Sequence, residues 1–165
     1  MSCNCNCKNS KVGVKFARIH KNALLPAYAR EGDAGFDFFA LMEDQPIVIP
    51  PNTFGFLVKT GLKVWLPKNY ELQVRDKSGM CVKTRIRVSN SPGTIDEGFK
   101  GEIQIIIDNF SDKPYIISNE NRKIAQGVVK YVPPVKIEEI SEEEINARET
   151  ERGEGGFGST GLSHE

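Results

Sequence analysis

Short runs of alternating apolar and polar residues, many of them β-branched, recur along most of this chain and are separated by glycine, proline, asparagine and aspartate. Because successive side chains of a strand point to opposite faces, such runs predict half-buried strands. Many short strands at this spacing predict an all-β protein, either an antiparallel sandwich or a barrel. The expected strands lie at residues 12–19, 36–41, 47–64, 70–74, 85–88, 101–109, 115–117 and 124–131.

A single short helix is expected near the C-terminus. Ser141, followed three residues later by Glu144, forms the sequence pattern of a capping box. Hydrophobicity then falls away, so we expect an ordered β domain over residues 12–148 and a mobile arm over residues 149–165. Residues 1–11 are expected to form a disordered head.

Three of the four cysteines, Cys3, Cys5 and Cys7, alternate within this polar head. The C-x-C-x-C spacing is not that of a zinc knuckle, and no second cluster completes a tetrahedral site. We interpret the head as non-essential, with binding of a soft metal as the alternative. Cys81 lies in a strand-like segment and is interpreted as a small buried hydrophobic residue.

The charge of the chain is balanced, with 22 acidic and 22 basic side chains. No overall electric field therefore draws it to nucleic acid or to a membrane, and any bound anion must be met by local groups. No apolar run approaches the ~18 residues of a membrane span, and the N-terminus lacks the apolar stretch of a signal peptide. A cytoplasmic protein with neither nucleic acid nor membrane as a partner is expected.

Two polar segments flank expected strands in the first half of the chain. In GDAGFDFFA, the residues alone place Asp33 in a turn and Asp37 on the outward face of a strand. In VRDKSGM, two cations, a hydroxyl and a flexible backbone gather at a strand end: Arg75, Lys77, Ser78 and Gly79. Such a set binds phosphate through charge-assisted hydrogen bonds, and a solvated turn is the alternative.

Two further segments follow in the second half. In NSPGTIDEGFKGEI, a hairpin would explain the glycines and the proline but not Phe99, three residues after Asp96. That pattern suits a pocket that holds a flat ring beside a carboxylate. In NRKIAQG, Gln126 interrupts an apolar strand, so its amide either bonds across strands or faces a ligand.

The tail RGEGGFGSTG cannot pack a core, because glycine brings no side chain to bury. Its amides and hydroxyls, with the guanidinium of Arg152, suit phosphate oxygens, and Phe157 suits stacking on a base. A plain disordered tail is the alternative. The tail is not a Walker A loop, because no lysine precedes its hydroxyls, and it does not open a helix after a strand.

Taken in order, AGFDFFA, RDKSGM, NSPGTIDEGFKGEI, NRKIAQG and RGEGGFGSTG resemble the motifs of the trimeric dUTPases, the dUTP diphosphatases. The resemblance runs over residues 12–161. It implies a jelly-roll-like antiparallel β domain with a flexible glycine-rich arm. It also implies a homotrimer in which each active site lies between subunits and is closed by the C-terminal arm of another chain.

The resemblance further implies hydrolysis of dUTP to dUMP and pyrophosphate with Mg²⁺, which is held mainly by the phosphates. Such a reaction keeps uracil out of DNA and supplies dUMP for dTMP synthesis. Asp96 is expected to activate the water that attacks the α-phosphorus, and Phe99 to pack on the deoxyribose. The uracil edge is expected to be read by Asn90 and by the loop backbone of Gly93, Thr94 and Ile95.

The remaining expected roles concern the phosphates, the metal and the arm. Lys77, Ser78 and Gly79 are expected to bind phosphates. Gln126 is expected at the α-phosphate, and Gln126 and Asp37 are expected to hold Mg²⁺ through water. Closure over the γ-phosphate and stacking on uracil are expected from the arm residues Arg152, Gly158, Ser159, Thr160 and Phe157.

The chain departs from the family pattern at several of these positions. Asp76 and Lys77 stand where the family usually has proline and arginine, so the bidentate fork of arginine is lost, and Arg75 is a candidate to compensate. Phe99 stands where tyrosine is usual. Asn-Arg-Lys at 121–123 replaces glycine, an acid and arginine, which puts a local ion pair in question.

Two other functions remain open at this point. A dCTP deaminase shares the fold, but the glycine-rich arm argues against it, and Glu102 is the one candidate for its proton shuttle. A non-catalytic relative that binds dUTP or a protein partner as a regulator is the second alternative. The presence of both Asp96 and the arm disfavours a loss of catalysis and says nothing about an added partner.

Overall fold

The computed structural model describes residues 11–155, which divide into two compact units. The first unit ends at Pro133 and the second begins at Pro134. The expected arm over 149–165 therefore lies within the second unit, and its boundary at residue 149 stays a prediction. The cysteines of the head and the arm residues Phe157, Gly158, Ser159 and Thr160 lie outside the described residues.

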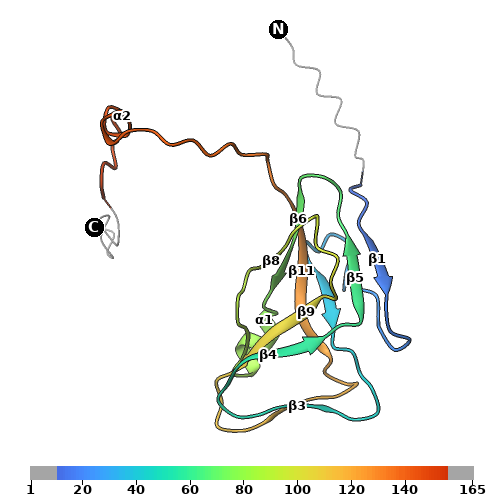
Figure 1. Cartoon of the computed structure of the whole chain (residues 1–165). Coiled ribbons are helices and arrows are strands. Elements are labelled where there is room, and N and C mark those ends of the chain that lie inside the picture. Colours follow the sequence, from blue (N-terminus) through green and yellow to red (C-terminus); the bar gives the residue numbers. More distant parts are fainter. Residues whose placement is uncertain (1–10, 156–165) are drawn as a thin grey trace. The chain divides into compact units, whose positions relative to one another are not determined.

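The regular elements of the first unit are strands apart from one short helix, as expected for an all-β domain (Figure 1). The expected run at 47–64 is divided into three strands by turns at Asn52 and Gly61, which both have positive φ. The strands are β1 (Lys15–Arg18), β2 (Phe36–Phe39), β3 (Ile47–Ile49), β4 (Thr53–Lys59), β5 (Leu62–Trp65), β6 (Tyr70–Arg75), β7 (Ile86–Val88), β8 (Gly93–Ile95), β9 (Gln104–Asn109), β10 (Tyr115–Ile117) and β11 (Lys123–Tyr131).

Helix α1 (Ser78–Lys83) was not expected, and it corrects the interpretation of Cys81. Cys81 lies in this helix and is half-buried, not a fully buried strand residue. A helix of 6 residues is too short to display a 3.6-residue period, and its valine is a residue type that favours strands. Its last turn is closed by Thr84, whose hydroxyl donates to the carbonyl of Met80 at 2.7 Å.

Helix α2 (Glu142–Asn146) in the second unit confirms the expected capping box. The hydroxyl of Ser141 accepts a hydrogen bond from the backbone N–H of Glu144 at 3.1 Å, which satisfies one free donor of the first turn. Neither helix in residues 11–155 is long and apolar enough to cross a membrane.

The strands form four antiparallel sheets, as expected for an all-β antiparallel domain. The largest has the order β2-β11-β6-β8, and the next has the order β4-β9-β7. Two further pairs, β1-β5 and β10-β3, complete the unit. Strand β6 therefore lies between β11 on one side and β8 on the other.

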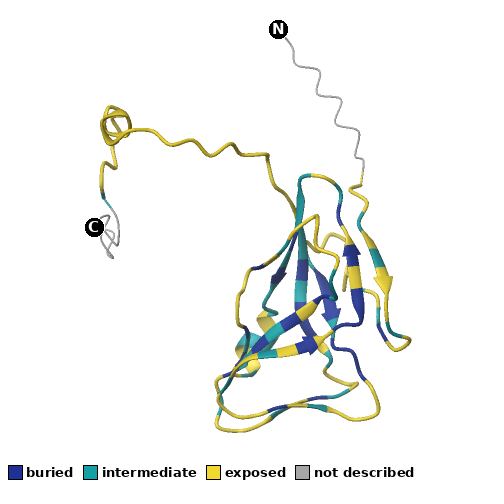
Figure 2. Ribbon diagram, viewed as in Figure 1, coloured by how far each residue is buried: buried dark blue, intermediate teal, exposed yellow. Residues whose placement is uncertain are grey.

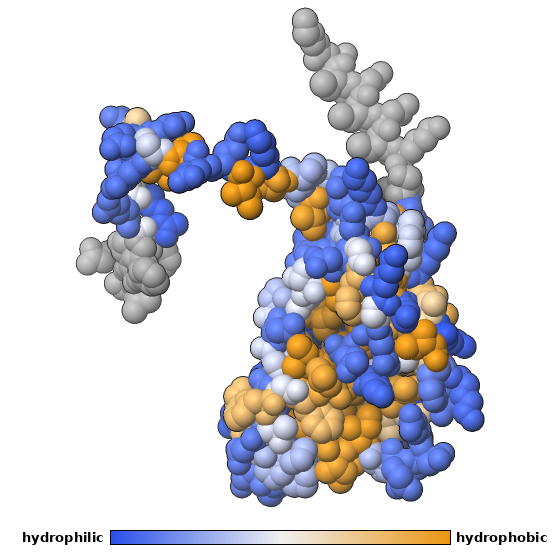
Figure 3. Space-filling view, in the orientation of Figure 1, coloured by the Kyte–Doolittle hydropathy of each residue, from blue (hydrophilic) through white to orange (hydrophobic). Residues whose placement is uncertain are grey.

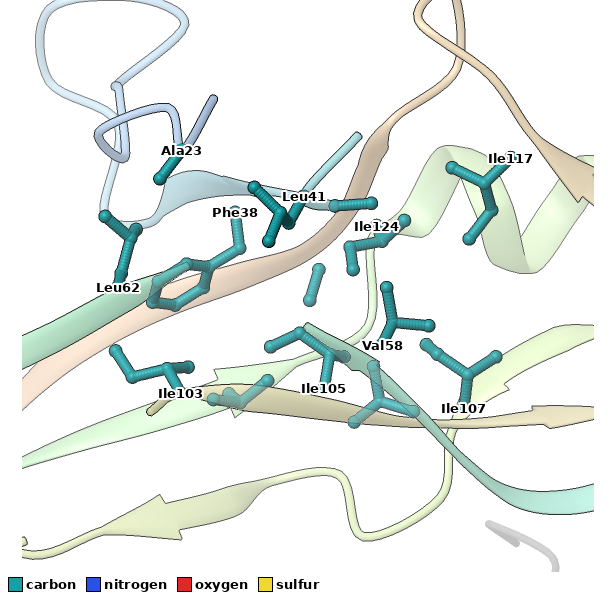
Figure 4. Packing of buried hydrophobic residues seen from close by; sticks show 14 of the residues in the cluster. Ala23, Phe38, Leu41, Val58, Leu62, Ile103, Ile105, Ile107, Ile117 and Ile124 are labelled. Atoms are coloured by element: carbon teal, nitrogen blue, oxygen red, sulfur yellow. The ribbon is translucent and has the colours of Figure 1, made fainter. Parts of the chain in front are cut away.

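The core lies between the two larger sheets (Figures 2 and 4). Burial alternates along β9, where Ile105 and Ile107 point inward, toward Phe38 of β2 and Ile124 of β11. Fully burying each such side chain contributes about 1.5–3 kcal/mol. Asn109 ends β9 with a fully buried amide, whose Nδ2 donates to the carbonyls of Ile49, Pro50 and Lys113.

The pairing of β11 with both neighbours requires a glycine at position 127. Gly127 lies opposite Phe36 of β2 and Val74 of β6. A Cβ at this position would overlap the ring of Phe36 and lie 2.7 Å from Cε2 of Phe38. The two phenylalanine rings thus fill the space that a side chain would need, and they bring β2 close to β11.

We therefore expect Gly127→Ala to lower the free energy of unfolding by about 1–3 kcal/mol, because the extra methyl overpacks the core. Gly13→Ala is the matched control, since a Cβ there would meet no atom within 4 Å. Urea unfolding of both variants measures the difference. Equal free energies for the two variants would show that the rings move aside at no cost.

Candidate functional site

The third polar segment lines a pocket of about 300 Å³ in the first unit. Six predicted site residues lie in it together: Asn90, Gly93, Thr94, Ile95, Asp96 and Phe99. The sequence analysis missed the apolar wall, to which Leu57 and Ile106 contribute as cross-strand partners on β4 and β9. No local signal marks these residues, because both are ordinary strand positions until the two sheets are assembled.

Strand β8 supplies a backbone edge to this pocket. Gly93, Thr94 and Ile95 pair with Val74, Gln73 and Leu72 of β6, and β8 is the last strand of its sheet. The outer edge of such a strand presents N–H and C=O groups that no neighbouring strand uses. A flat polar ring can therefore be hydrogen-bonded by backbone groups inside a largely apolar pocket.

Asn90 lies against the start of this edge. A Cβ on Gly93 would come within 2.8 Å of Asn90 Nδ2, so the glycine allows the amide to fold over the strand. Asn90 is the only asparagine among the residues lining the pocket. Its amide offers both donors and an acceptor beside the backbone groups of β8.

Asp96 and Phe99 are held by one turn at the other end of β8. The backbone N–H of Phe99 donates to the carbonyl of Asp96 at 3.1 Å. The ring of Phe99 lies over Gly101, where a Cβ would be 2.6 Å from Cζ. Both Asp96 and Phe99 remain exposed in this chain. The expected combination of a carboxylate and an aromatic face is therefore present in one pocket.

A second group of predicted residues centres on Asp37, whose expected outward-facing position is wrong. Asp37 is 5% exposed, and its carboxylate forms ion pairs with Lys77 through Oδ1 and with Lys123 through Oδ2 at 3.0 Å. The strand pattern suggested an exposed residue because an unpaired buried charge is costly. The lysines that compensate for burial are distant in sequence.

These lysines decide the ionisation of Asp37. Burial alone would raise the pKa of the carboxyl. Hydrogen bonds and charge from Lys77 and Lys123 outweigh burial and lower the pKa below its ordinary value of 3.8. Lys123 stands where the fourth motif of the family pattern has arginine. An ion pair is therefore kept at this position, with Lys123 as the cation.

Gln126 lies beside this ion-pair cluster. It is the cross-strand partner of Asp37 on one side and of Arg75 on the other. None of residues 11–155 hydrogen-bonds with its side-chain amide, whose Oε1 would lie 3.3 Å from a Cβ on Gly35. The alternative that this amide bonds across strands is not realised in this part of the chain. Arg75 is engaged by Gln73, with Nε donating to Oε1 at 3.0 Å.

Two other predicted phosphate ligands belong to the same segment as Lys77, and a third lies in the second unit. Ser78 and Gly79 begin α1 directly after Lys77, and both are exposed. Arg152 lies in the second unit, where its Nε donates to the carbonyl of Gly155 at 2.8 Å. Asp37, Lys77 and Gln126 do not line the pocket of Asn90 and Asp96.

The described residues form no metal cage of their own, since residues 11–155 contain no cluster of three histidine, cysteine, aspartate or glutamate side chains that suits a metal ion. Asp37 nevertheless retains lone pairs that can accept water hydrogen bonds beside Gln126. This donor set suits an ion such as Mg²⁺, which keeps several water ligands and binds oxygen atoms of phosphates.

Glu102, the candidate for a deaminase proton shuttle, has a structural partner. Its Oε1 accepts a hydrogen bond from the backbone N–H of Gly61 at 2.8 Å, although the residue also lines the pocket. Gly61 has a φ of 68° and ends the turn between β4 and β5. The carboxylate therefore holds this turn against the pocket wall.

Comparison with known proteins places these features in a family. The family model described as dUTPase matches residues 21–161 of this chain. The chain is 47% identical over 144 residues to the deoxyuridine 5'-triphosphate nucleotidohydrolase of Clostridium kluyveri, covering 87% of this chain and 94% of that protein. It is 46% identical over 150 residues to the Helicobacter pylori protein of the same name, covering 91% and 97% respectively.

A solved structure agrees with this assignment at the level of the fold. The dUTPase of Staphylococcus bacteriophage 80alpha, solved with dUPNHPP, superposes with a TM-score of 0.76 and 25% identity. The match covers 91% of this chain and 99% of that chain. The expected jelly-roll-like β fold is thereby confirmed.

The ion-pair cluster yields a stability prediction. Asp37→Asn leaves Lys77 and Lys123 without a counter-charge, so at about pH 7 we expect a loss of about 1–3 kcal/mol, limited by the partial exposure of Lys123. The lowered pKa means that the carboxylate stabilises the fold above its unfolded value of 3.8. That contribution is lost as the pH falls through the folded pKa.

The difference between wild type and Asp37→Asn should therefore shrink as the pH is lowered to about 3. Urea unfolding across this range measures it, with the exposed Asp112→Asn as the control. A difference that does not change with pH would mean that folding does not lower the pKa of Asp37.

Proposed function

The chain belongs to the dUTPase family, and on this premise we propose that it hydrolyses dUTP to dUMP and pyrophosphate. The observation that carries the proposal is the pocket in which the free edge of β8, Asn90, Phe99 and Asp96 come together. Its volume of about 300 Å³ is at the small end of ligand pockets, which suits a nucleoside more than a large substrate.

Uracil would be recognised mainly by the backbone. Its polar edge alternates carbonyl, N–H and carbonyl, and the groups of β8 from Gly93 to Ile95 offer donors and acceptors in a row. The Asn90 amide completes the set. Cytosine presents an amino group in place of one carbonyl, so its N–H donor would face an N–H donor of the pocket. Both donors would be buried without an acceptor, and this cost would favour uracil strongly over cytosine.

The sugar would lie on Phe99. The ring is held over Gly101 and offers an apolar face to the deoxyribose. A ribose 2′-hydroxyl placed on that face would lose its hydrogen bonds to water without gaining a partner, which costs free energy. The phenylalanine ring serves this purpose as well as tyrosine would, because the contact requires only the face.

Asp96 would orient the attacking water and accept its proton. An ionised aspartate is a weak base, so most of the rate acceleration must come from positioning and from cations that neutralise the departing pyrophosphate. The turn that fixes Asp96 relative to Phe99 supports positioning, because it would hold the general base at a set place relative to the ring that packs on the sugar.

The phosphates would be bound outside this pocket. Lys77, Ser78 and Gly79 would contact phosphate oxygens and Gln126 the α-phosphate, and Asp37 and Gln126 would hold Mg²⁺ through water. When bound with the triphosphate, Mg²⁺ supplies charge neutralisation for the leaving group. Lys77 would then exchange part of its contact with Asp37 for a phosphate, while Lys123 keeps the carboxylate paired.

A complete site would need more than one chain. The pocket and the Asp37 cluster are separate groups within one first unit, which favours a homotrimer whose sites combine residues of different subunits. Exposed apolar side chains on the same unit favour association, as a patch of this kind is costly in water. Figure 3 shows apolar surface around β3 and β4, and Val48, Phe54, Leu57, Phe110 and Ile116 are all at least half exposed.

The arm would close the assembled site. Arg152 and the expected residues Gly158, Ser159 and Thr160 would cover the γ-phosphate, and Phe157 would stack on uracil. Closure excludes bulk water and strengthens each charged contact. The reaction would keep uracil out of DNA and supply dUMP for dTMP synthesis in the cytoplasm.

The role of Asp96 is tested by Asp96→Asn. We expect pyrophosphate release from dUTP to fall about 10²–10⁴-fold, because the general base is lost, while dUTP binding is retained. Wild type should release pyrophosphate from dUTP and not from dCTP, dTTP or UTP, and the exposed Asp112→Asn should behave like wild type. Unchanged turnover in Asp96→Asn would assign the base to another residue, and ammonia release from dCTP would favour a deaminase.

Removal of residues 150–165 tests the arm. We expect turnover of dUTP to fall about 10²-fold, because the γ-phosphate is no longer positioned and the site stays open to water. The free energy of unfolding of the first unit should stay the same, since the deleted residues belong to the second unit. Full turnover by the shortened chain would contradict the role of the arm.

A further inference from the structure

Asp76 lies between the two groups of site residues, at a position where the family pattern usually has proline. We propose that Asp76 is a positioning residue for base recognition, because it holds both ends of the turn that carries Asn90. The inference rests on the proposed function, in which Asn90 reads uracil. It concerns a residue that neither contacts the base nor takes part in the chemical step.

The contacts of Asp76 are two hydrogen bonds to one turn. Its carboxylate Oδ1 accepts from the backbone N–H of Val88 at 2.7 Å. Its own backbone N–H donates to Oγ of Ser91 at 3.2 Å. Val88 and Ser91 are the first and last residues of a turn closed by Ser91 N–H to the carbonyl of Val88 at 3.2 Å. Asn90 is the third residue of that turn.

The register of the sheet explains why Asp76 reaches Ser91. The β6–β8 ladder pairs Gln73 with Thr94 and Val74 with Gly93. Continued by two residues on each strand, the same register places Asp76 opposite Ser91. The intervening Pro92 has no N–H, so the backbone ladder cannot continue there. The Ser91 hydroxyl takes the place of a backbone acceptor for Asp76.

The position of Asn90 follows from these anchors. Ser89, its neighbour, is tied to β9 by a hydrogen bond from its N–H to the carbonyl of Ile106 at 2.9 Å. With Val88 and Ser91 held by Asp76, the turn is fixed on two sides, and the Asn90 amide is directed over Gly93. A proline at position 76 would offer neither the N–H nor the carboxylate. A chain with the usual proline at this position would therefore lack both anchors of the turn.

The effect should appear in substrate binding and not in the chemical step. Asp96 is held by a separate turn with Phe99 at the far end of β8, which Asp76 does not contact. A loosened Asn90 would weaken binding of the base equally in the ground state and the transition state. Such a loss raises KM and leaves kcat unchanged.

The first experiment compares steady-state kinetics of four variants. Asp76→Ala loses the carboxylate bond, and Asp76→Pro loses both bonds. We expect KM for dUTP to rise about tenfold or more, with kcat within about twofold of wild type. Asp76→Asn keeps an acceptor oxygen and the N–H and should retain most of the affinity. Asp112→Ala, which removes an exposed aspartate in the β9–β10 turn, is the control.

A second experiment measures the mobility of the turn from Val88 to Ser91 in the absence of substrate. Hydrogen exchange at the Val88 amide should be faster in Asp76→Ala than in wild type and close to wild type in Asp76→Asn, since this amide donates to the carboxylate. Affinity for dUMP should fall by the same factor as KM rises. Equal exchange, equal dUMP affinity and equal KM in Asp76→Ala and wild type would overturn the proposal.

Three outcomes distinguish failure of the positioning role from failure of the proposed function. If Asp76→Ala and Asp76→Asn both lose kcat together with free energy of unfolding, Asp76 supports the fold in general and the positioning role is wrong. If wild type neither hydrolyses dUTP nor binds dUMP, the proposed function fails and the positioning role fails with it. Turnover of dUTP with an unchanged KM in Asp76→Ala overturns the positioning role alone.

Discussion

The double pairing of β6 is the constraint on which both parts of the site depend. On one side, β6 pairs with β8 and so presents the free backbone edge of residues 93–95 to the pocket. On the other side, it pairs with β11, which brings Gln126 beside Arg75. The two residues that follow β6 bind to different parts of the site. Asp76 is hydrogen-bonded to the turn that carries Asn90, and Lys77 forms an ion pair with Asp37. A shift of β6 by one residue would exchange the faces of its side chains and disrupt both groups.

Periodicity predicted this architecture well because it records which residues face the core. The alternation along β9, with Ile105 and Ile107 inside, and the capping box at Ser141 are local features that one strand or one turn determines. Helix α1 was missed because its propensities point to a strand, and its existence depends on contacts such as Thr84 to Met80.

The candidate site was predictable where its residues are adjacent in sequence and unpredictable where they are not. Asn90 to Phe99 form one pocket because one loop and one short strand contain them all. Asp37 was misplaced because its burial depends on Lys77 and Lys123, which are distant along the chain. Lys77 and Lys123 both stand where the family usually has arginine, and both pair with the carboxylate of Asp37. Each replacement keeps the positive charge but loses the bidentate geometry of arginine.

Lys77 and Lys123 do not line the pocket beside β8, so in the proposed function these replacements leave recognition of the base to the backbone edge. Thr94 and Ile95 present the same N–H and C=O groups whatever side chains they carry, so in the proposed function specificity would depend on where the strand is held more than on these two side chains. The side chains that matter are then those that hold the surrounding backbone. Gly93 and Gly101 leave space for Asn90 and Phe99, and Asp76 holds the turn between β7 and β8. In the proposed function, a new side chain at Thr94 or Ile95 would therefore disturb base recognition less than the loss of a residue that holds the strand or the turn.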